Sequence, residues 1–91
     1  MSVGDPGTEP PRKAGGIEID EVADGYVVYQ PAFDRVHYLN HTAVIVLELC
    51  TGENDAAAIA GFVQRAYELP EPPAAEVAAC LVRLASVGLV E

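Results

Sequence analysis

The sequence lacks tryptophan, has only two cysteines and contains no long apolar run. About 18 consecutive apolar residues are needed to span a bilayer, and residues 1–16 have no apolar stretch of the kind that signal peptides need. We therefore predict neither a membrane span nor a secretion signal. Two cysteines are too few for a disulfide scaffold, and both Cys50 and Cys80 lie in apolar segments. This pattern indicates two buried, reduced thiols in a cytoplasmic protein.

Basic residues are also scarce, with five Lys and Arg against 14 Asp and Glu and a net charge of −9. Asp5 and Glu9 balance Arg12 and Lys13, so the whole acidic excess lies in residues 17–91. An acidic surface repels phosphate backbones, which counts against nucleic-acid binding. The Gly, Pro and mixed charge of residues 1–16 indicate a disordered N-terminal arm, followed by a single domain over residues 17–91.

Period-two alternation of apolar and polar residues predicts three short strands after this arm. Residues 17–22 and 26–29 flank Asp24-Gly25, a pair that favours a tight hairpin because glycine tolerates positive φ. Gln30-Pro31 ends the second strand, and residues 33–39 alternate as a third. Three short strands cannot bury one face alone, so we expect a helical layer to cover them.

Capping residues predict where three helices begin and end. The first begins after Asn40 and ends before Gly52, and Leu39 and Val44 are placed to form a hydrophobic staple. The second begins after Asn54 and ends before Leu69-Pro70. The third opens at Pro72-Pro73 and ends at Gly88, with Leu89 contacting Leu84.

Apolar periodicity supports the second and third helices. Their core-facing positions are Ile59, Phe62, Val63, Ala66 and Tyr67 in the second, and Val77, Leu81 and Leu84 in the third. The first is apolar nearly all round and is expected to be central to the core. The order of elements predicts an α+β fold, with a three-stranded antiparallel sheet followed by three helices.

The residues that could carry chemistry do not form a recognisable active site. His37 and His41 are separated by the helix cap at Asn40, and neither cysteine completes a zinc spacing with them. Neither thiol has a visible base beside it. Adjacent acids such as Asp20-Glu21 point to opposite faces of a strand. We therefore expect no catalytic residues, no metal and no cofactor.

The edge of the third strand is a candidate binding surface. It carries Arg35 and His37 with little of the proline or lysine that blunts sheet edges. An extended peptide could add there as a fourth strand, with main-chain bonds for affinity and pockets for specificity. The alternative is an edge closed by another part of the chain or by a second copy.

The ordered motifs of the chain resemble the PqqD-like family. The resemblance covers about residues 22–91, and no single motif in it is specific. The matching segments are Tyr38-Leu39-Asn40-His41-Thr42-Ala43, the apolar helix to Leu49, Thr51-Gly52-Glu53, Ala58-Ile59-Ala60, Tyr67, and the V…L…L…GL pattern from Val77 to Leu89.

This resemblance implies a winged-helix-like peptide-recognition domain that is not an enzyme. Such domains bind the leader of a ribosomally made precursor peptide between the third strand and the third helix. They present it to a separate modifying enzyme, such as a radical SAM protein, a cyclodehydratase or a leader peptidase. By the resemblance, the peptide-binding residues are Arg35, Val36, His37, Tyr38, Leu39, Cys80, Arg83, Leu84 and Val87. Arg35 and Arg83 are expected to pair with acidic leader residues, while Val36, Tyr38 and Leu84 line apolar pockets.

Three further readings stay open. A winged-helix nucleic-acid-binding regulator requires a basic recognition helix, yet Arg83 is the single basic residue of the third predicted helix and Arg65 that of the second. The second interpretation is an enzyme subunit that uses a cysteine. The third is a dimerisation module that uses the same edge strand. The precursor and its pathway, whether pyrroloquinoline quinone, lasso peptide or another, do not follow from the sequence. Nor does the oligomeric state, monomer or edge-strand dimer.

Overall fold

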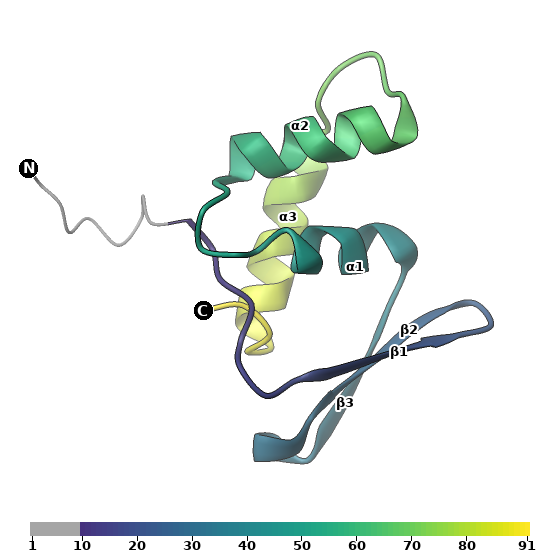
Figure 1. The fold of residues 1–91 in the computed structure, drawn as a ribbon, viewed down its shortest axis with the longest axis vertical. Helices are drawn as coiled ribbons and strands as arrows, with labels where there is room; N and C mark the ends of the chain where they lie inside the picture. The colour runs from purple at the N-terminus through teal and green to yellow at the C-terminus, as the bar shows by residue number, and fades with distance from the viewer. Residues whose placement is uncertain (1–9) are drawn as a thin grey trace, which may run out of the picture.

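The computed structural model describes residues 10–91 as a small sheet followed by three helices (Figure 1). The strands are β1 (Glu18–Val22), β2 (Gly25–Gln30) and β3 (Arg35–Leu39). The helices are α1 (His41–Glu48), α2 (Ala56–Tyr67) and α3 (Ala74–Ser86). The α+β class and the predicted order of elements are confirmed.

The three strands form one antiparallel sheet in the order β1-β2-β3, and within residues 10–91 one edge of β3 has no neighbouring strand. Val28 pairs with Ile19 on one side and with His37 on the other, and these side chains share the face that meets the helices. Val28 is fully buried there. Because side chains alternate along a strand, Val27, Tyr29, Val36 and Tyr38 lie on the opposite face.

The first hairpin forms where it was predicted, but its glycine has another role. Val22 pairs with Gly25, and the positive-φ residues of the described chain do not include Gly25. A Cβ atom on Gly25 would lie 2.7 Å from the backbone oxygen of Leu39. Gly25 therefore lets β3 approach β2 closely, and the prediction that it supplies a left-handed turn was wrong.

The third strand is shorter than predicted. Pro31–Phe33 form a 3-10 turn, and Asp34 takes a left-handed conformation with φ of 52° before β3 begins at Arg35. Proline has no N–H for a strand ladder and favours such a turn. Phe33 is consequently not a strand residue, as predicted, but part of the connection between β2 and β3.

The start of α1 is confirmed, but its end is not. The side chain of Asn40 accepts a hydrogen bond of 2.8 Å from the backbone N–H of Ala43. The helix ends at Glu48, three residues before Thr51, the last residue predicted to be helical. Gly52 takes its positive φ of 88° in the bend that follows, where it meets the side chain of Arg12.

The predicted start of α2 is wrong by one residue, whereas the predicted end of α3 is confirmed. Asp55 caps α2 through Ala58, whereas Asn54 donates its side-chain amide to the carbonyl of Leu49, so the predicted cap is displaced by one residue. At the end of α3, Gly88 has φ of 81° and Leu89 donates to the carbonyl of Leu84 at 2.9 Å. This is the predicted Schellman ending.

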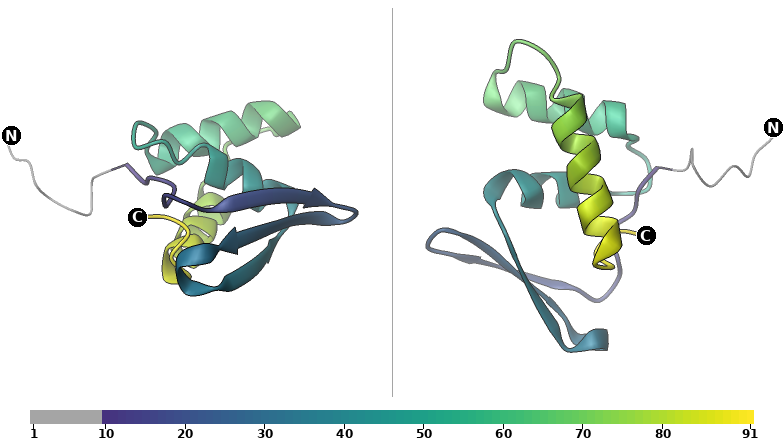
Figure 2. Two further views of the ribbon diagram at one scale, coloured as in Figure 1. Left: turned by 60° about the horizontal axis from the view of Figure 1, so that its bottom comes forward. Right: turned by 180° about the vertical axis from the view of Figure 1, so that it is seen from behind.

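The core lies between the sheet and the helical layer, with α1 at its centre. Val46 and Leu47 of α1 are fully buried, as are Ile59 of α2 and Leu89 after α3. In α2, Phe62 and Tyr67 were predicted to face the core but are about two-fifths exposed. Figure 2 shows α3 crossing α1, with its C-terminal end directed toward the sheet.

Residues 10–16 run along the helical layer instead of forming a free arm. The backbone N–H of Lys13 donates to the carbonyl of Cys50 at 2.7 Å, and the backbone N–H of Ala14 donates to the carbonyl of Leu89 at 2.9 Å. Glu91 donates to the carbonyl of Arg12 at 2.7 Å. The predicted disorder is wrong for this segment, and residues 1–9 of the predicted arm lie outside the described residues. Within residues 10–91, none of the helices is long and apolar enough to cross a membrane.

Candidate functional site

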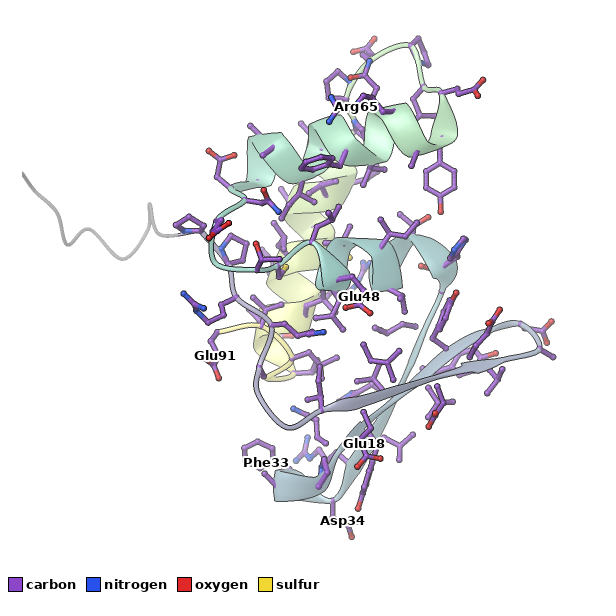
Figure 3. The ribbon with its side chains drawn as sticks, in the orientation of Figure 1. Glu18, Phe33, Asp34, Glu48, Arg65 and Glu91 are labelled. Carbon is purple, nitrogen blue, oxygen red and sulfur yellow. The ribbon has the colours of Figure 1, made fainter. Side chains whose placement is uncertain are left out.

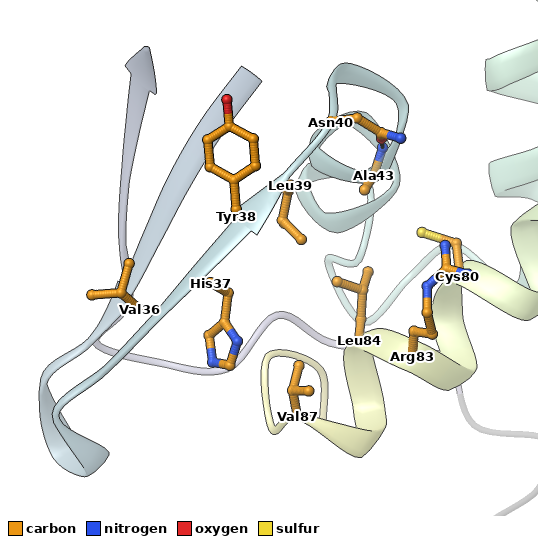
Figure 4. Close-up of a pocket in the computed structure, with 10 residues that line it drawn as sticks. All are labelled: Val36, His37, Tyr38, Leu39, Asn40, Ala43, Cys80, Arg83, Leu84 and Val87. Carbon is orange, nitrogen blue, oxygen red and sulfur yellow. Dashed lines mark hydrogen bonds between the residues drawn. The ribbon is translucent and has the colours of Figure 1, made fainter. Parts of the chain in front are cut away.

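An open groove of about 410 Å³ separates the free edge of β3 from α3 (Figure 4). β3 forms one wall, the start of α1 closes one end, and the C-terminal half of α3 forms the other wall. The groove is lined by Val36, His37, Tyr38, Leu39, Asn40, Ala43, Cys80, Arg83, Leu84 and Val87.

This lining includes all but one of the residues predicted to bind a peptide. Arg35 is the exception: it begins β3 and does not line the groove. Asn40 and Ala43 were missed as groove residues. Both belong to the capping turn of α1, which the sequence predicts, but their nearness to α3 depends on tertiary packing.

The main chain of β3 faces the groove at alternate residues. Val22 and Gly25 close the first hairpin as a hydrogen-bonded pair, and hydrogen-bonded pairs alternate along an antiparallel ladder. In the next ladder, the residues of β3 that bond to β2 are therefore Arg35, His37 and Leu39. The N–H and C=O groups of Val36 and Tyr38 point to the free edge. In the described chain, neither residue forms a backbone hydrogen bond outside the sheet.

The side chains of β3 divide between two faces, which corrects part of the prediction. His37 and Leu39 are partly buried and point toward the helices, whereas Val36 is 63% exposed and Tyr38 is 62% exposed. Figure 4 shows the side chains of Val36 and Tyr38 directed away from Leu84 and Val87. Leu84 faces the groove as predicted, but Val36 and Tyr38 border it through their backbone.

The groove differs in charge from the rest of the molecule. None of its ten lining residues is acidic, although the chain has a net charge of −9. Arg83 is exposed on the α3 wall and takes part in no salt bridge among the described residues. The groove therefore places one basic side chain beside apolar ones in an otherwise acidic domain.

A buried glutamine connects the sheet to the end of α3. Gln30 is 3% exposed, and its Nε2 donates to the carbonyl of Gly88 at 3.2 Å. Its Oε1 lies 2.5 Å from Nε2 of His37, which must act as the donor because an amide oxygen can only accept. Through Gln30, His37 of β3 is thus linked to Gly88, which follows α3.

The cysteines have the properties of core residues. Burial, together with a smaller contribution from nearby Cys80, raises the pKa of the Cys50 thiol to about 11. Burial also raises the pKa of the Cys80 thiol, against the opposing effect of Arg83. Both thiols are thus protonated at neutral pH and are poor nucleophiles. Residues 10–91 contain no cluster of three His, Cys, Asp or Glu side chains that could hold a metal ion.

A second cavity lies on the other side of α1. It has a volume of about 450 Å³, and it shares Cys80 with the groove. The remaining lining comes mostly from apolar side chains of the three helices, including Val46, Val63 and Val77. Cys80 therefore separates two hollows along one face of α3.

Comparison with known proteins gives one match. The family model described as coenzyme PQQ synthesis protein D (PqqD) matches residues 25–90, which include β2, β3 and all three helices. No curated protein and no solved structure matches the chain.

Proposed function

This chain belongs to the PqqD family, and on that basis we propose that it binds the leader segment of a ribosomally synthesised precursor peptide. The leader adds as a strand to β3 and is presented to a separate modifying enzyme or leader peptidase. The protein itself performs no chemistry in this process. The family description supports a place in the synthesis of PQQ or of another peptide-derived product.

The observation that carries this proposal is the free edge of β3. The N–H and C=O groups of Val36 and Tyr38 point toward the groove, where the described chain gives them no backbone partner outside the sheet. An added strand would satisfy them and would lie between β3 and α3. Main-chain pairing supplies affinity in this mode of recognition.

The side chains of the groove support a particular leader chemistry. An added strand would direct every second side chain toward His37, Leu39, Leu84 and Val87, where apolar leader residues fit. A carboxylate near the α3 wall would reach Arg83. We therefore propose a leader with alternating apolar residues and an acidic residue among them. Nothing in the groove favours the nucleic-acid alternative, because Arg83 is its only arginine or lysine.

The test is a backbone N-methylation scan of a synthetic leader, taken from the precursor gene nearest to the gene for this protein. N-methylation removes one donor and leaves every side chain unchanged. Affinity measured by fluorescence anisotropy is expected to fall about tenfold or more at every second position, because a buried acceptor on β3 loses its partner. Intervening positions are expected to change little. Binding without this alternation would contradict strand addition.

Proline substitutions in β3 provide the matched protein variants. Val36→Pro removes an N–H that faces the groove, and proline is tolerated at such edge positions. It is expected to weaken leader binding about tenfold while the domain stays folded. His37→Pro removes an N–H that bonds to β2, so it is expected to destabilise the sheet itself. Equal effects of the two variants on folding would contradict the assignment of the free edge.

A further inference from the structure

The sheet face opposite the helices carries an exposed apolar surface. We call it the outer patch and define it by Val27, Tyr29, Val36 and Tyr38, which are paired across β2 and β3. Val36 and Tyr38 are 63% and 62% exposed. Phe33, in the turn at the end of these strands, is 66% exposed. Neighbouring large apolar side chains with this exposure are typical of interaction surfaces.

Carboxylates border the outer patch. Glu18 pairs with Tyr29 and Asp20 pairs with Val27, so both acids lie on the same face as the patch. Asp34 accepts a hydrogen bond of 3.3 Å from the hydroxyl of Tyr29. Figure 3 shows Glu18, Phe33 and Asp34 together at the bottom of the view, at the end of the sheet where β2 passes into β3. Arg35 is the only basic residue among the three strands and their connections apart from His37.

We propose that the outer patch is the docking surface for the enzyme that acts on the bound precursor. The partner surface has an apolar centre bordered by lysine and arginine, which complements Val36 and Tyr38 inside a border of carboxylates. A second copy of this chain fits the surface poorly, because the same acids would meet across a symmetric interface. This inference rests on the proposed function, since it concerns delivery of the bound leader.

In this arrangement, Val36 and Tyr38 contact one partner through their main chain and another through their side chains. Their backbone groups face the groove and the leader, while their side chains face the opposite direction, toward the enzyme. A strand added about 4.8 Å from β3 would place every second side chain of the leader beside the outer patch. The enzyme would then contact the protein and the leader together. Linkage requires that the leader and the enzyme raise each other's affinity by the same factor.

The test compares two double variants of the full chain. The partner is the purified modifying enzyme or leader peptidase encoded next to the precursor gene. Val36→Thr with Tyr38→Thr removes the apolar patch and keeps β-branched residues that favour strands. Enzyme affinity, measured by surface plasmon resonance at a leader concentration that saturates each variant, is expected to fall about tenfold or more. Glu18→Gln with Asp20→Asn is expected to reduce the salt dependence of enzyme binding.

Val82→Thr is the matched control. Val82 is 69% exposed on α3 and does not line the groove, so its substitution is expected to leave enzyme affinity unchanged. Thermal unfolding of each variant checks that the domain is intact. If the Val36 and Tyr38 substitutions left enzyme affinity unchanged, the inference would be overturned. It would also be overturned if these substitutions disrupted a homodimer of this chain and did not weaken enzyme binding. Leader binding without any enzyme binding would overturn the docking inference and leave strand addition to β3 intact. Enzyme binding without leader binding would instead refute the proposed function.

Discussion

Gln30 links the two walls of the groove through its side-chain amide. It is buried, and it bonds both to the end of α3 and to His37 of β3. Its partner Gly88 lies 58 residues away in sequence. Local periodicity cannot identify such a contact, which explains why sequence reasoning treated Gln30 only as the end of a strand. Alternation along β3 separates Val36 and Tyr38 from Arg35 and His37, but it does not say which of the two faces meets the helices.

Gln30→Leu is expected to lower the free energy of unfolding by about 1–3 kcal/mol, because it leaves buried polar partners unsatisfied. Urea denaturation measures this change. Gln64→Leu is the control, since the amide of Gln64 bonds to the carbonyl of Leu69 at an exposed position. We expect that substitution to change stability by less than about 0.5 kcal/mol. Similar losses from both substitutions would show that the buried contact has no special importance.

Helix ends were predictable to the extent that their signals are local. Asn40 and Gly88 were identified because a cap and a left-handed stop depend on residues within one turn. Asn54 and Asp55 are both good caps, so propensity alone could not choose between them. Phe33 was assigned to a strand because its alternation continues through the turn that Pro31 begins. The groove walls followed from the family resemblance, but which side chains face the groove depends on the register of the strands.

Asn40→Ala tests the junction between β3 and α1. Loss of the cap is expected to cost about 1 kcal/mol of unfolding free energy, measured by chemical denaturation. Asn40→Asp is the control, because a carboxylate keeps the cap and interacts favourably with the helix N-terminus. If the alanine variant proved as stable as the aspartate variant, the capping bond would contribute nothing to this junction.

At the scale of the whole molecule, the two ends of the described chain lie together. Residues 11–14 form backbone hydrogen bonds with residues 50–52 and 89–91. They cover the region around Cys50, which is 2% exposed, and Leu89, which is fully buried. The composition of residues 1–16 predicts disorder here, because composition reports the average behaviour of a segment. Composition does not report the specific backbone pairing that this segment forms with the rest of the folded chain.

A chain that starts at Ile17 is therefore expected to lose about 3 kcal/mol or more of unfolding free energy, since several backbone bonds disappear. Thermal and urea denaturation measure the loss. Lys13→Gln in the full chain removes only the Lys13–Glu48 ion pair, whose side chains are 38% and 53% exposed. An ion pair of this exposure contributes less than about 1 kcal/mol, so this control is expected to be nearly neutral. A shortened chain with unchanged stability would contradict a structural role for residues 10–16.

The pairing between residues 12 and 91 also has a kinetic consequence. It closes nearly the whole described chain into one loop, and the entropic cost of closing a loop rises with its length. Contacts that are this distant in sequence are slow to form, so we expect this pairing to follow assembly of the core. Interactions absent from the folding transition state affect mainly the rate of unfolding. This terminal segment would then determine how long the folded protein persists, and have little influence on how fast it folds.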